Sequence, residues 1–371
     1  MSSLRGLSSL GMFLPSYLYH LTRVYEKPQT NTSNSGIGNM MLRSTMSSAS
    51  SSSEAPQKNH FFCSSAGNAG LACATTAHTL ACPATIVVPT TAREPVLRRL
   101  RQLGASVVIH GSSWFEADTH LREVVMPASA LADADASATG EKTKQVYVPP
   151  FDHEDIWAGA ATLMDEVAEQ MKVVHRAYVD AVVCNVGGGG LLNGILEGIW
   201  GPSRNKGGRG LGKEVGGGKE PRVLAIETVG ADSFNQSVKA GELRMMKQMT
   251  SIAASLGALQ VSRKTWEWYE QVGAGAGEGE KNLVSATVTD AEAAMASVRF
   301  ADEHRMLVEV ACGATLATAY NGDLRRYMGE GMSDEEWKNF NAVLVVCGGS
   351  HVGVDVLRQY REEYGGEVTW A

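Results

Sequence analysis

The most constraining feature of the chain is a short apolar segment that runs into four consecutive glycines. Residues 181–186 are mostly apolar and β-branched, which predicts a short buried strand, and apolar residues recur at helical spacing from Leu191 to Ile199. A strand, a glycine turn and a helix start form an anion trap, because backbone N–H groups converge beside the positive end of the helix. We therefore expect residues 187–190 to bind a phosphate. The alternative is a glycine-rich turn that only packs a helix against a sheet.

The glycine spacing does not match the common nucleotide-binding motifs. A G-x-G-x-x-G motif counted from Gly187 meets Leu192 at its third glycine, and counted from Gly189 it meets Leu191 at its second. No acidic residue follows at the usual distance of ~20 residues, and the Gly-Lys-Ser/Thr of a P-loop is absent. The sequence therefore disfavours a NAD-linked oxidoreductase and a P-loop nucleotidase.

The bulk composition is that of an ordinary soluble protein with one large or two medium domains. The 371 residues are 44% hydrophobic, and 40 of them are glycine, which indicates many tight loops. The net charge of −7 argues against nucleic acid and anionic membranes as partners, and no run approaches the ~18 apolar residues of a membrane span. The six cysteines lack C-x-x-C spacing, so we expect reduced thiols.

The opening segment indicates little about structure but bears on localisation. Residues 1–25 contain two arginines and several serines with no acidic residue before Glu26, a composition similar to that of a mitochondrial transit peptide. We expect a cytoplasmic protein, with the mitochondrion as the alternative.

A second strand, turn and helix precedes the first in the chain. Residues 60–63 predict a strand, and the polar loop from Ser64 to Gly70 leads into an alanine-rich helix that ends near Leu80. Hydroxyl and amide side chains join the backbone donors here, which suits a carboxylate. The alternative is that Ser64 or Ser65 only caps the helix.

Strands and helices alternate along the rest of the chain, which predicts parallel sheets with right-handed crossovers. Residues 127–144 predict a loose surface loop, and residues 156–178 a long helix. A metal site at Asp152, His153 and Asp155 is conceivable, but adjacent residues at a helix start favour capping and surface roles.

These motifs together resemble one enzyme family over about residues 36–360. The order of the 64–70 loop, the 187–190 turn, Glu227 to Phe234 and Cys347-Gly348-Gly349-Ser350 is similar to that in the fold-type II pyridoxal-phosphate enzymes, in particular the L-serine/L-threonine dehydratases. The resemblance implies a two-domain α/β fold, like that of the tryptophan synthase β chain, with open, mostly parallel sheets flanked by helices. Residues 1–35 would form an atypical N-terminal segment, residues 36–150 a small domain and residues 151–371 a large one.

The resemblance also implies site residues. Phosphate binding would fall to the tetraglycine turn, which is Gly187, Gly188, Gly189 and Gly190, and to Leu191 directly after it. Substrate binding would fall to Ser64, Ser65, Gly67, Asn68 and Ala69. Asn68 would also bind the ring hydroxyl of the cofactor, and Cys347 would face its pyridine nitrogen, where a thiol gives a mild electron sink suited to β-elimination. A monovalent cation such as K+ would bind at Glu227, Ala231, Ser233, Leu256 and Ala258.

One position departs from the family pattern. The family places its Schiff-base lysine in Ser-Phe-Lys-x-Arg-Gly-Ile-Gly, and alignment on Gly36-Ile37-Gly38 puts Ser33 at the lysine position. Serine forms no imine and is no comparable base, and losing a positioned proton-transfer group typically costs ~10²–10⁴ in rate. Three explanations remain: an incorrectly assigned first exon that supplies residues 1–35, a catalytically dead homologue, or a substituted lysine.

The resemblance implies deamination of L-serine to pyruvate and ammonia, and of L-threonine to 2-oxobutanoate, by a cytoplasmic homodimer of amino-acid metabolism and gluconeogenesis that uses pyridoxal phosphate. The alternative is a homologue that binds cofactor or amino acid without turnover. In either case we expect the 64–70 loop and the tetraglycine turn to face each other across one cleft.

Overall fold

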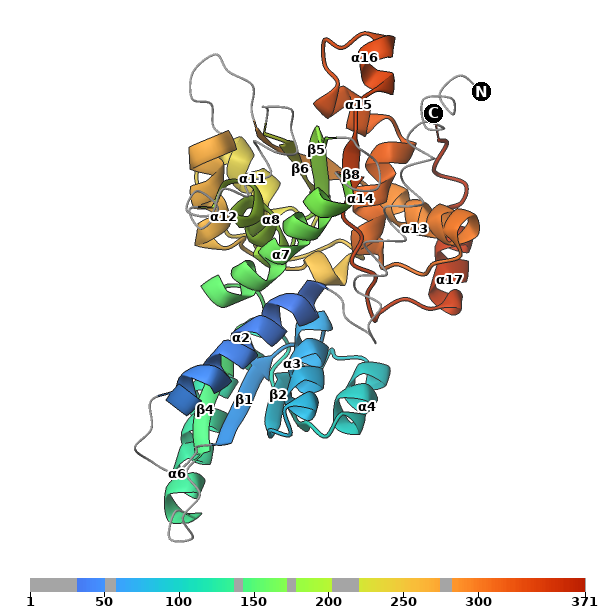
Figure 1. Ribbon diagram of the computed structural model, residues 1–371. Helices are drawn as coiled ribbons and strands as arrows, with labels where there is room; N and C mark the ends of the chain where they lie inside the picture. Colours follow the sequence, from blue (N-terminus) through green and yellow to red (C-terminus); the bar gives the residue numbers. More distant parts are fainter. Residues whose placement is uncertain are drawn as a thin grey trace. The chain divides into compact units, whose positions relative to one another are not determined.

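The computed structural model describes residues 32–50, 58–136, 143–171, 178–201, 220–273 and 282–370 (Figure 1). The chain divides into two compact units, an N-terminal unit of Thr30–Ala160 and a C-terminal unit that begins at Ala161. The sequence predicts a domain boundary at residue 150, and the units part ten residues later, within α7 (Glu154–Gln170).

The N-terminal unit contains a four-stranded sheet whose strands all pair in parallel, in the order β3-β2-β1-β4. Its elements, besides the start of α7, are α2 (Thr32–Ser50), β1 (Lys58–Ser64), α3 (Asn68–Thr79), β2 (Ala84–Val88), α4 (Glu94–Gln102), β3 (Ser106–Ile109), α5 (Trp114–His120), the π-helix η1 (Leu121–Val125), α6 (Met126–Ala136) and β4 (Thr143–Val148).

Successive residues of β1 enter two different cores, because side chains alternate between the faces of a strand. Phe61 and Cys63 pack with apolar residues of α2, α3 and α4, whereas Phe62 packs with Ala117 and Leu121 of α5 and η1. The sheet is therefore covered on both faces, as parallel sheets are. Figure 1 shows α2, α3 and α4 along one of these faces.

The C-terminal unit has the same kind of sheet, with all strands parallel in the order β7-β6-β5-β8. Its strands are β5 (Ala181–Asn185), β6 (Arg222–Thr228), β7 (Leu283–Val288) and β8 (Ala342–Leu344). Its helices after α7 are α8 (Gly190–Trp200), α11 (Ser233–Ala240), the 3-10 helix η4 (Ala254–Leu256), α12 (Arg263–Trp268), the π-helix η5 (Tyr269–Gly273), α13 (Asp290–His304), α14 (Val310–Tyr320), α15 (Asp323–Met328), α16 (Asp334–Lys338) and α17 (Val354–Tyr364).

The residues of β5 alternate between two cores in the same way. Val182 and Cys184 pack with α7, α8 and Phe234 of α11, whereas Ala181 and Val183 pack with α13 and α14. Figure 1 shows α7, α8, α11 and α12 on one side of this sheet and α13 and α14 on the other. The prediction of a fold with parallel sheets flanked by helices is confirmed.

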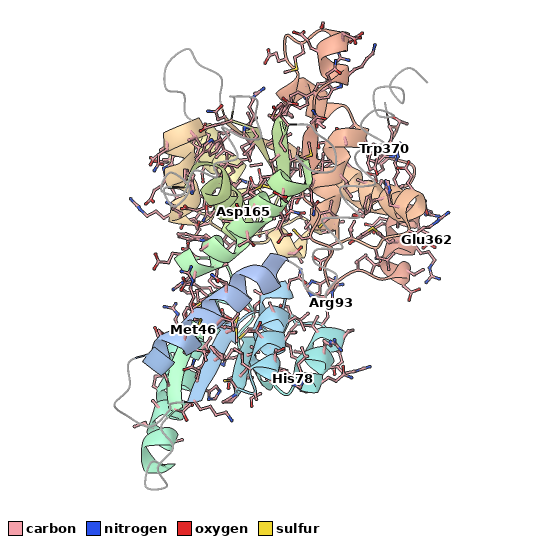
Figure 2. The ribbon with its side chains drawn as sticks, viewed as in Figure 1. Met46, His78, Arg93, Asp165, Glu362 and Trp370 are labelled. Carbon is pink, nitrogen blue, oxygen red and sulfur yellow. The ribbon has the colours of Figure 1, made fainter. Side chains whose placement is uncertain are left out.

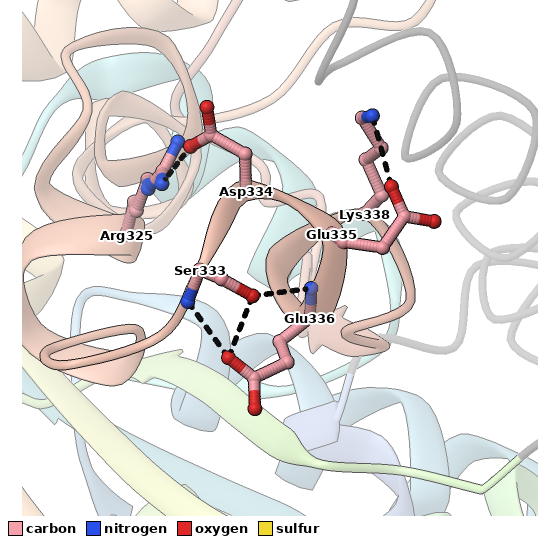
Figure 3. Close-up of polar contacts among 6 residues, drawn as sticks. All are labelled: Arg325, Ser333, Asp334, Glu335, Glu336 and Lys338. Atoms are coloured by element: carbon pink, nitrogen blue, oxygen red, sulfur yellow. Dashed lines mark hydrogen bonds and ion pairs between the residues drawn. The ribbon is translucent and has the colours of Figure 1, made fainter.

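Helix ends on the surface follow ordinary capping rules. At α16, the Ser333 hydroxyl accepts the Glu336 N–H, and the Glu336 carboxylate accepts the Ser333 N–H and hydroxyl (Figure 3). Lys338 pairs with Glu335 on the same helix. In the N-terminal unit, Met46 of α2 and His78 of α3 carry exposed side chains (Figure 2).

Two of the predicted elements were wrong in extent. Residues 127–136 of the predicted loop lie in α6 (Met126–Ala136), whose five alanines favour a helix despite the serine and aspartates between them. The predicted long helix runs as α7 from Glu154 to Gln170, and Tyr178 is not helical. Residues 137–142 and 172–177 lie outside the described residues.

Candidate functional site

The two strand-turn-helix motifs follow the strands at which chain order reverses in each sheet. β1 has β2 on one side and β4 on the other, and β5 has β6 on one side and β8 on the other. Ligands of open α/β sheets bind beyond the carboxyl ends of strands at such switch points. The loop after β1 and the turn after β5 therefore occupy the ligand-binding edge of their own units.

The tetraglycine turn is too crowded to hold side chains. A Cβ on Gly189, whose φ is +97°, would lie 2.0 Å from Oγ1 of Thr265, and a Cβ on Gly187 would lie 3.0 Å from the carbonyl oxygen of Ser255. Gly189 is the N-cap of α8, and no side chain caps it. The first N–H groups of α8 thus lack intrahelical acceptors. A bare turn at a helix start provides backbone donors for an anion.

The segment after β8 lies beside this turn in the sheet, because β8 pairs with β5. The Cys347 N–H donates to Sγ of Cys312 at 3.2 Å, and the Glu309 N–H donates to the Gly348 carbonyl at 3.0 Å. A hydrogen bond with Cys347, together with burial, raises the pKa of the Cys312 thiol well above its ordinary value. The start of α14 therefore holds Cys347 at the carboxyl edge of the sheet.

Ser64, the last residue of β1, uses its side chain inside the unit. Its hydroxyl is fully buried and donates to Oδ1 of Asp118 at 2.5 Å, and its carbonyl accepts the indole N–H of Trp114 at 2.7 Å. Asp118 also accepts the Tyr147 hydroxyl at 2.7 Å and Nε of Arg122 at 2.8 Å. This network of α5, η1 and β4 side chains fixes the start of the 64–70 loop.

The rest of the 64–70 loop leaves the start of α3 open. The N-cap is Gly67 and no side chain caps the helix, so the alternative that Ser64 or Ser65 caps it is wrong. Ser65 instead accepts the Gly67 N–H at 3.1 Å. A Cβ on Gly70 would lie 2.0 Å from the Ser65 carbonyl, so the loop can close this tightly only on glycine. Asn68 and Ala69 are the first two residues of α3, half-buried and buried respectively.

Glu227 is a buried carboxylate near the end of β6. It is 1% exposed and accepts the N–H groups of Phe234 at 3.0 Å and Asn235 at 2.7 Å. Burial raises the pKa of Glu227 to about 8, because the ionised form loses its hydration. A cation beside this carboxylate would favour its ionised form.

The other predicted cation ligands lie on two nearby segments of the C-terminal unit. Ala231 and Leu256 share one apolar core, and Ser233 is the first residue of α11. The carbonyl of Ser233 accepts the Ser237 hydroxyl at 2.7 Å, and that of Leu256 accepts the Ala258 N–H at 2.8 Å. Cation binding at these carbonyls stays a prediction.

The described residues contain no cluster of three or more His, Cys, Asp or Glu that could hold a metal ion. At the start of α7, the Asp155 N–H donates to Nδ1 of His153 at 3.1 Å, and Arg43 pairs with the Asp155 carboxylate. This geometry agrees with the capping and surface roles predicted there. No helix among the described residues is long and apolar enough to cross a membrane.

This chain is similar to known proteins in sequence and in fold. The sequence model of the family described as "Pyridoxal-phosphate dependent enzyme" matches residues 32–348. The chain belongs to this family of pyridoxal-phosphate-dependent enzymes. The L-serine dehydratase of Saccharomyces cerevisiae (strain AWRI1631) is 33% identical over 317 residues, which cover 85% of this chain and 83% of the relative.

A second relative and a solved structure are also similar to this pyridoxal-phosphate-dependent enzyme. The serine dehydratase-like protein of Rattus norvegicus is 38% identical over 304 residues, 82% of this chain and 79% of the relative. The crystal structure of a fungal L-serine ammonia-lyase from Rhizomucor miehei matches with a TM-score of 0.70 and 29% identity, covering 91% of this chain and 90% of that one. The predicted family is therefore confirmed.

The residues present fit part of the cofactor of a pyridoxal-phosphate-dependent enzyme. The bare tetraglycine turn, which excludes Cβ atoms and leaves helix N–H groups open, suits its phosphate. Covalent attachment of the cofactor needs a lysine amine, and the assignment of Ser33, in the first turn of α2, to the family's lysine position stays a prediction. The family match begins at residue 32 and thus includes this position.

The sequence did not single out several residues that support the site. Asp118 anchors Ser64, and Asn193, Ser262 and Thr265 lie behind the tetraglycine turn. Residues of this kind are recognised because they are polar and buried. Burial depends on how the chain packs, so it cannot be read from the local sequence. Asn193 alone carried a local signal, because it follows the turn within the first turn of a helix.

Proposed function

We propose that this chain binds pyridoxal phosphate and catalyses elimination of ammonia from L-serine to give pyruvate, and from L-threonine to give 2-oxobutanoate. The observation that carries the proposal is the uncapped tetraglycine turn at the switch point of the C-terminal sheet. The similarity to L-serine dehydratases over 85% of the chain supports the substrate class. When bound, the cofactor supplies an electron sink that acidifies the α-proton of an amino acid.

The tetraglycine turn holds the phosphate in this proposal. Backbone N–H groups of Gly187, Gly188, Gly189, Gly190 and Leu191 are its donors. Because these donors are part of the main chain, they need no side-chain ordering when the phosphate binds. The positive end of α8, which is 11 residues long, adds to the attraction.

The loop after β1 binds the substrate carboxylate in this proposal. Ser65 and Ala69 donate to it, together with the main chain of Ser64, because the Ser64 hydroxyl is already donated to Asp118. The Gly67 N–H, which donates to the Ser65 hydroxyl in the free protein, turns to the carboxylate when substrate binds. Asn68 binds the ring hydroxyl of the cofactor. The open N–H groups at the start of α3 favour an anion there.

Cys347 faces the ring nitrogen in this proposal. Its backbone is held by Cys312 at 3.2 Å, so the side chain projects from a fixed point at the edge of the sheet. A thiol stabilises a protonated ring nitrogen less than a carboxylate does. That difference favours β-elimination, which needs only a mild electron sink.

A second candidate function is ligand binding without turnover, and Ser33 is the observation that favours it. Serine cannot form a covalent bond to the cofactor aldehyde that exchanges with substrate, and it cannot move the α-proton as an amine does. A protein that keeps the phosphate turn and the carboxylate loop still binds cofactor or amino acid.

We also propose that the protein is a cytoplasmic homodimer and that K+ binds beside Glu227. Support for the cation is the buried carboxylate, which accepts backbone N–H groups but forms no ion pair with any described side chain.

The deciding experiment adds pyridoxal phosphate to the full-length protein and reduces the mixture with borohydride. For the elimination proposal we expect a visible absorption band, fixation of the cofactor on one lysine located by peptide mass spectrometry, and pyruvate from L-serine. Cofactor binding with neither a labelled lysine nor pyruvate would support the second candidate. Absence of binding would overturn both.

The variant Ser33→Lys is the matched control for this experiment. If position 33 alone separates the chain from its active relatives, Ser33→Lys should gain at least about 10²-fold in pyruvate formation, the lower end of what a positioned proton-transfer group contributes. A variant that binds cofactor as the parent does and stays inactive would show that more than this residue is missing.

A further inference from the structure

A closed ring of buried hydrogen bonds lies behind the tetraglycine turn. Nδ2 of Asn193 donates to Oγ of Ser262 at 3.0 Å, Oγ1 of Thr265 donates to Oδ1 of Asn193 at 2.8 Å, and the two hydroxyls are 3.0 Å apart. Since the single hydroxyl proton of Thr265 goes to Asn193, the Ser262 hydroxyl donates to Thr265. All three side chains are at most 5% exposed, so the ring is sealed from water.

This ring joins the turn to α12 through backbone contacts. The Ser262 N–H donates to the Gly188 carbonyl at 2.9 Å, and Oγ1 of Thr265 occupies the space that a Cβ on Gly189 would need. Asn193 lies one turn into α8, where its own N–H donates to the Gly189 carbonyl at 2.8 Å. The ring therefore contacts both central glycines of the turn.

The contact at Gly188 decides where a donor of the turn points. In a trans peptide the C=O and N–H groups point in opposite directions. Because the Gly188 carbonyl is held by Ser262, the N-cap of α12, the Gly189 N–H of the same peptide points away from the start of α12. Without this contact the peptide could rotate, since glycine has wide backbone freedom.

We propose that Asn193, Ser262 and Thr265 are positioning residues that orient the peptides of the tetraglycine turn and thereby set its affinity for the cofactor phosphate. The inference rests on the proposed function, in which this turn binds the phosphate. The ring acts through the backbone of Gly188 and Gly189, and its effect is confined to the phosphorylated form of the cofactor.

A pair of substitutions at Thr265 tests the proposal in the full-length protein. Thr265→Val keeps the shape of the side chain and removes the hydroxyl, whereas Thr265→Ser keeps the hydroxyl. Thr318→Val is the matched control, because Thr318 is equally buried in the same unit and its hydroxyl donates to the Thr315 carbonyl at 2.8 Å, within α14. Thermal unfolding of each variant reports any general loss of stability.

The readout is the ratio of the affinities for pyridoxal phosphate and pyridoxal, measured by equilibrium titration. Thr265→Val should weaken pyridoxal phosphate binding about tenfold, the value of one lost hydrogen bond, and leave pyridoxal binding unchanged. Thr265→Ser should retain most of the parent's ratio, and Thr318→Val should retain all of it. Inorganic phosphate, as a competitor of pyridoxal phosphate, should lose potency in Thr265→Val by a similar factor.

The outcomes separate this inference from the function on which it rests. A parent protein that binds pyridoxal phosphate no better than pyridoxal would overturn the phosphate site itself. A parent that discriminates, with a Thr265→Val variant that discriminates equally, would overturn the positioning role alone. An equal loss of discrimination between pyridoxal phosphate and pyridoxal in Thr265→Val and Thr318→Val would also overturn the positioning role. Should Thr265→Val not fold, Ser262→Ala, which keeps the N–H to Gly188, carries the same expectation and the same test.

Discussion

The loop after β1 and the turn after β5 both present an uncapped helix start, but they are built from different groups. Both follow the central strand of a parallel sheet and both leave a helix start without a side-chain cap. The 64–70 loop carries hydroxyl and amide groups and is anchored by a carboxylate, Asp118. The tetraglycine turn has no side chains and is held by packing at Gly187 and Gly189. A loop with side chains can select the shape of a small carboxylate, whereas a bare turn can surround a phosphate.

The two units also differ in how they bury a carboxylate. Asp118 receives two hydroxyls and the Arg122 guanidinium, which supplies the opposite charge. Glu227 receives two backbone N–H groups and forms no ion pair with a described side chain, and burial raises its pKa to about 8. The two carboxylates therefore differ in the charge that faces them, and the raised pKa of Glu227 follows from burial without a paired guanidinium among the described side chains.

The largest expected effect concerns Glu227→Gln. Because the pKa of Glu227 is about 8 in the folded protein and 4.5 ordinarily, the folded state keeps a proton that the unfolded chain releases. The free energy of unfolding should therefore fall as pH rises from about 4.5 to about 8, by on the order of 4–5 kcal/mol, and stay level above that. Glu227→Gln should lack this fall. Urea unfolding from pH 5 to 8 without K+ measures it.

The same titration tests the cation beside Glu227. With K+ bound, the carboxylate stays ionised, and the parent's fall in stability with pH should become smaller, with no such change in Glu227→Gln. Parallel pH profiles of parent and variant in the absence of K+ would contradict the raised pKa. If K+ leaves the parent's profile of stability against pH unchanged, no cation binds beside Glu227. The two units would then not differ by a cation at their buried carboxylates.

The next effect tests whether the tetraglycine turn is held by packing. Gly189→Ala should lower the free energy of unfolding by about 3 kcal/mol, because it adds a clash with Thr265 to a positive φ, and should abolish cofactor binding. Gly322→Ala is the control: its φ is +86° and nothing lies within 4 Å, so about 1 kcal/mol is expected from backbone strain alone. If denaturant unfolding shows the same loss of unfolding free energy in Gly189→Ala and Gly322→Ala, packing against Thr265 does not hold the turn.

The smallest effect tests the side-chain anchor of the 64–70 loop. Asp118→Ala leaves the buried Ser64 hydroxyl without its acceptor and should lower the free energy of unfolding by about 2 kcal/mol. The affinity of the cofactor-loaded protein for L-serine should fall. The ratio of the affinities for pyridoxal phosphate and pyridoxal should stay unchanged. Tyr147→Phe, which removes one hydrogen bond to Asp118, should show about half of each loss. An Asp118→Ala variant that changes this ratio of cofactor affinities as strongly as its affinity for L-serine would show that the 64–70 loop and the tetraglycine turn do not act independently.

Much of the fold was predictable because it depends on local periodicity. The apolar strands, the helical spacing after Gly190 and the alternation of elements predict parallel sheets, and the structure confirms them. The failures were at α6, where an alanine-rich segment predicted as a loop is helical, and at Tyr178, which was predicted helical and is not. The two strand-turn-helix motifs could be located for a related reason, since runs of glycine and a short polar loop are visible along the chain, and anion binding at them stays a prediction.

By itself, the sequence determined the order of strands and turns and the family, and it predicts that Ser33 takes the family's lysine position. Tertiary structure alone decided that Ser64 gives its hydroxyl to Asp118, that Glu227 is buried with no ion pair to a described side chain, and that Asn193, Ser262 and Thr265 close a ring. Ser64 and Asp118 are 54 positions apart, Asn193 and Thr265 are 72 apart, and the state of Glu227 depends on burial. Hydrogen bonds between distant residues and the loss of hydration are set by packing, and local sequence carries no record of either.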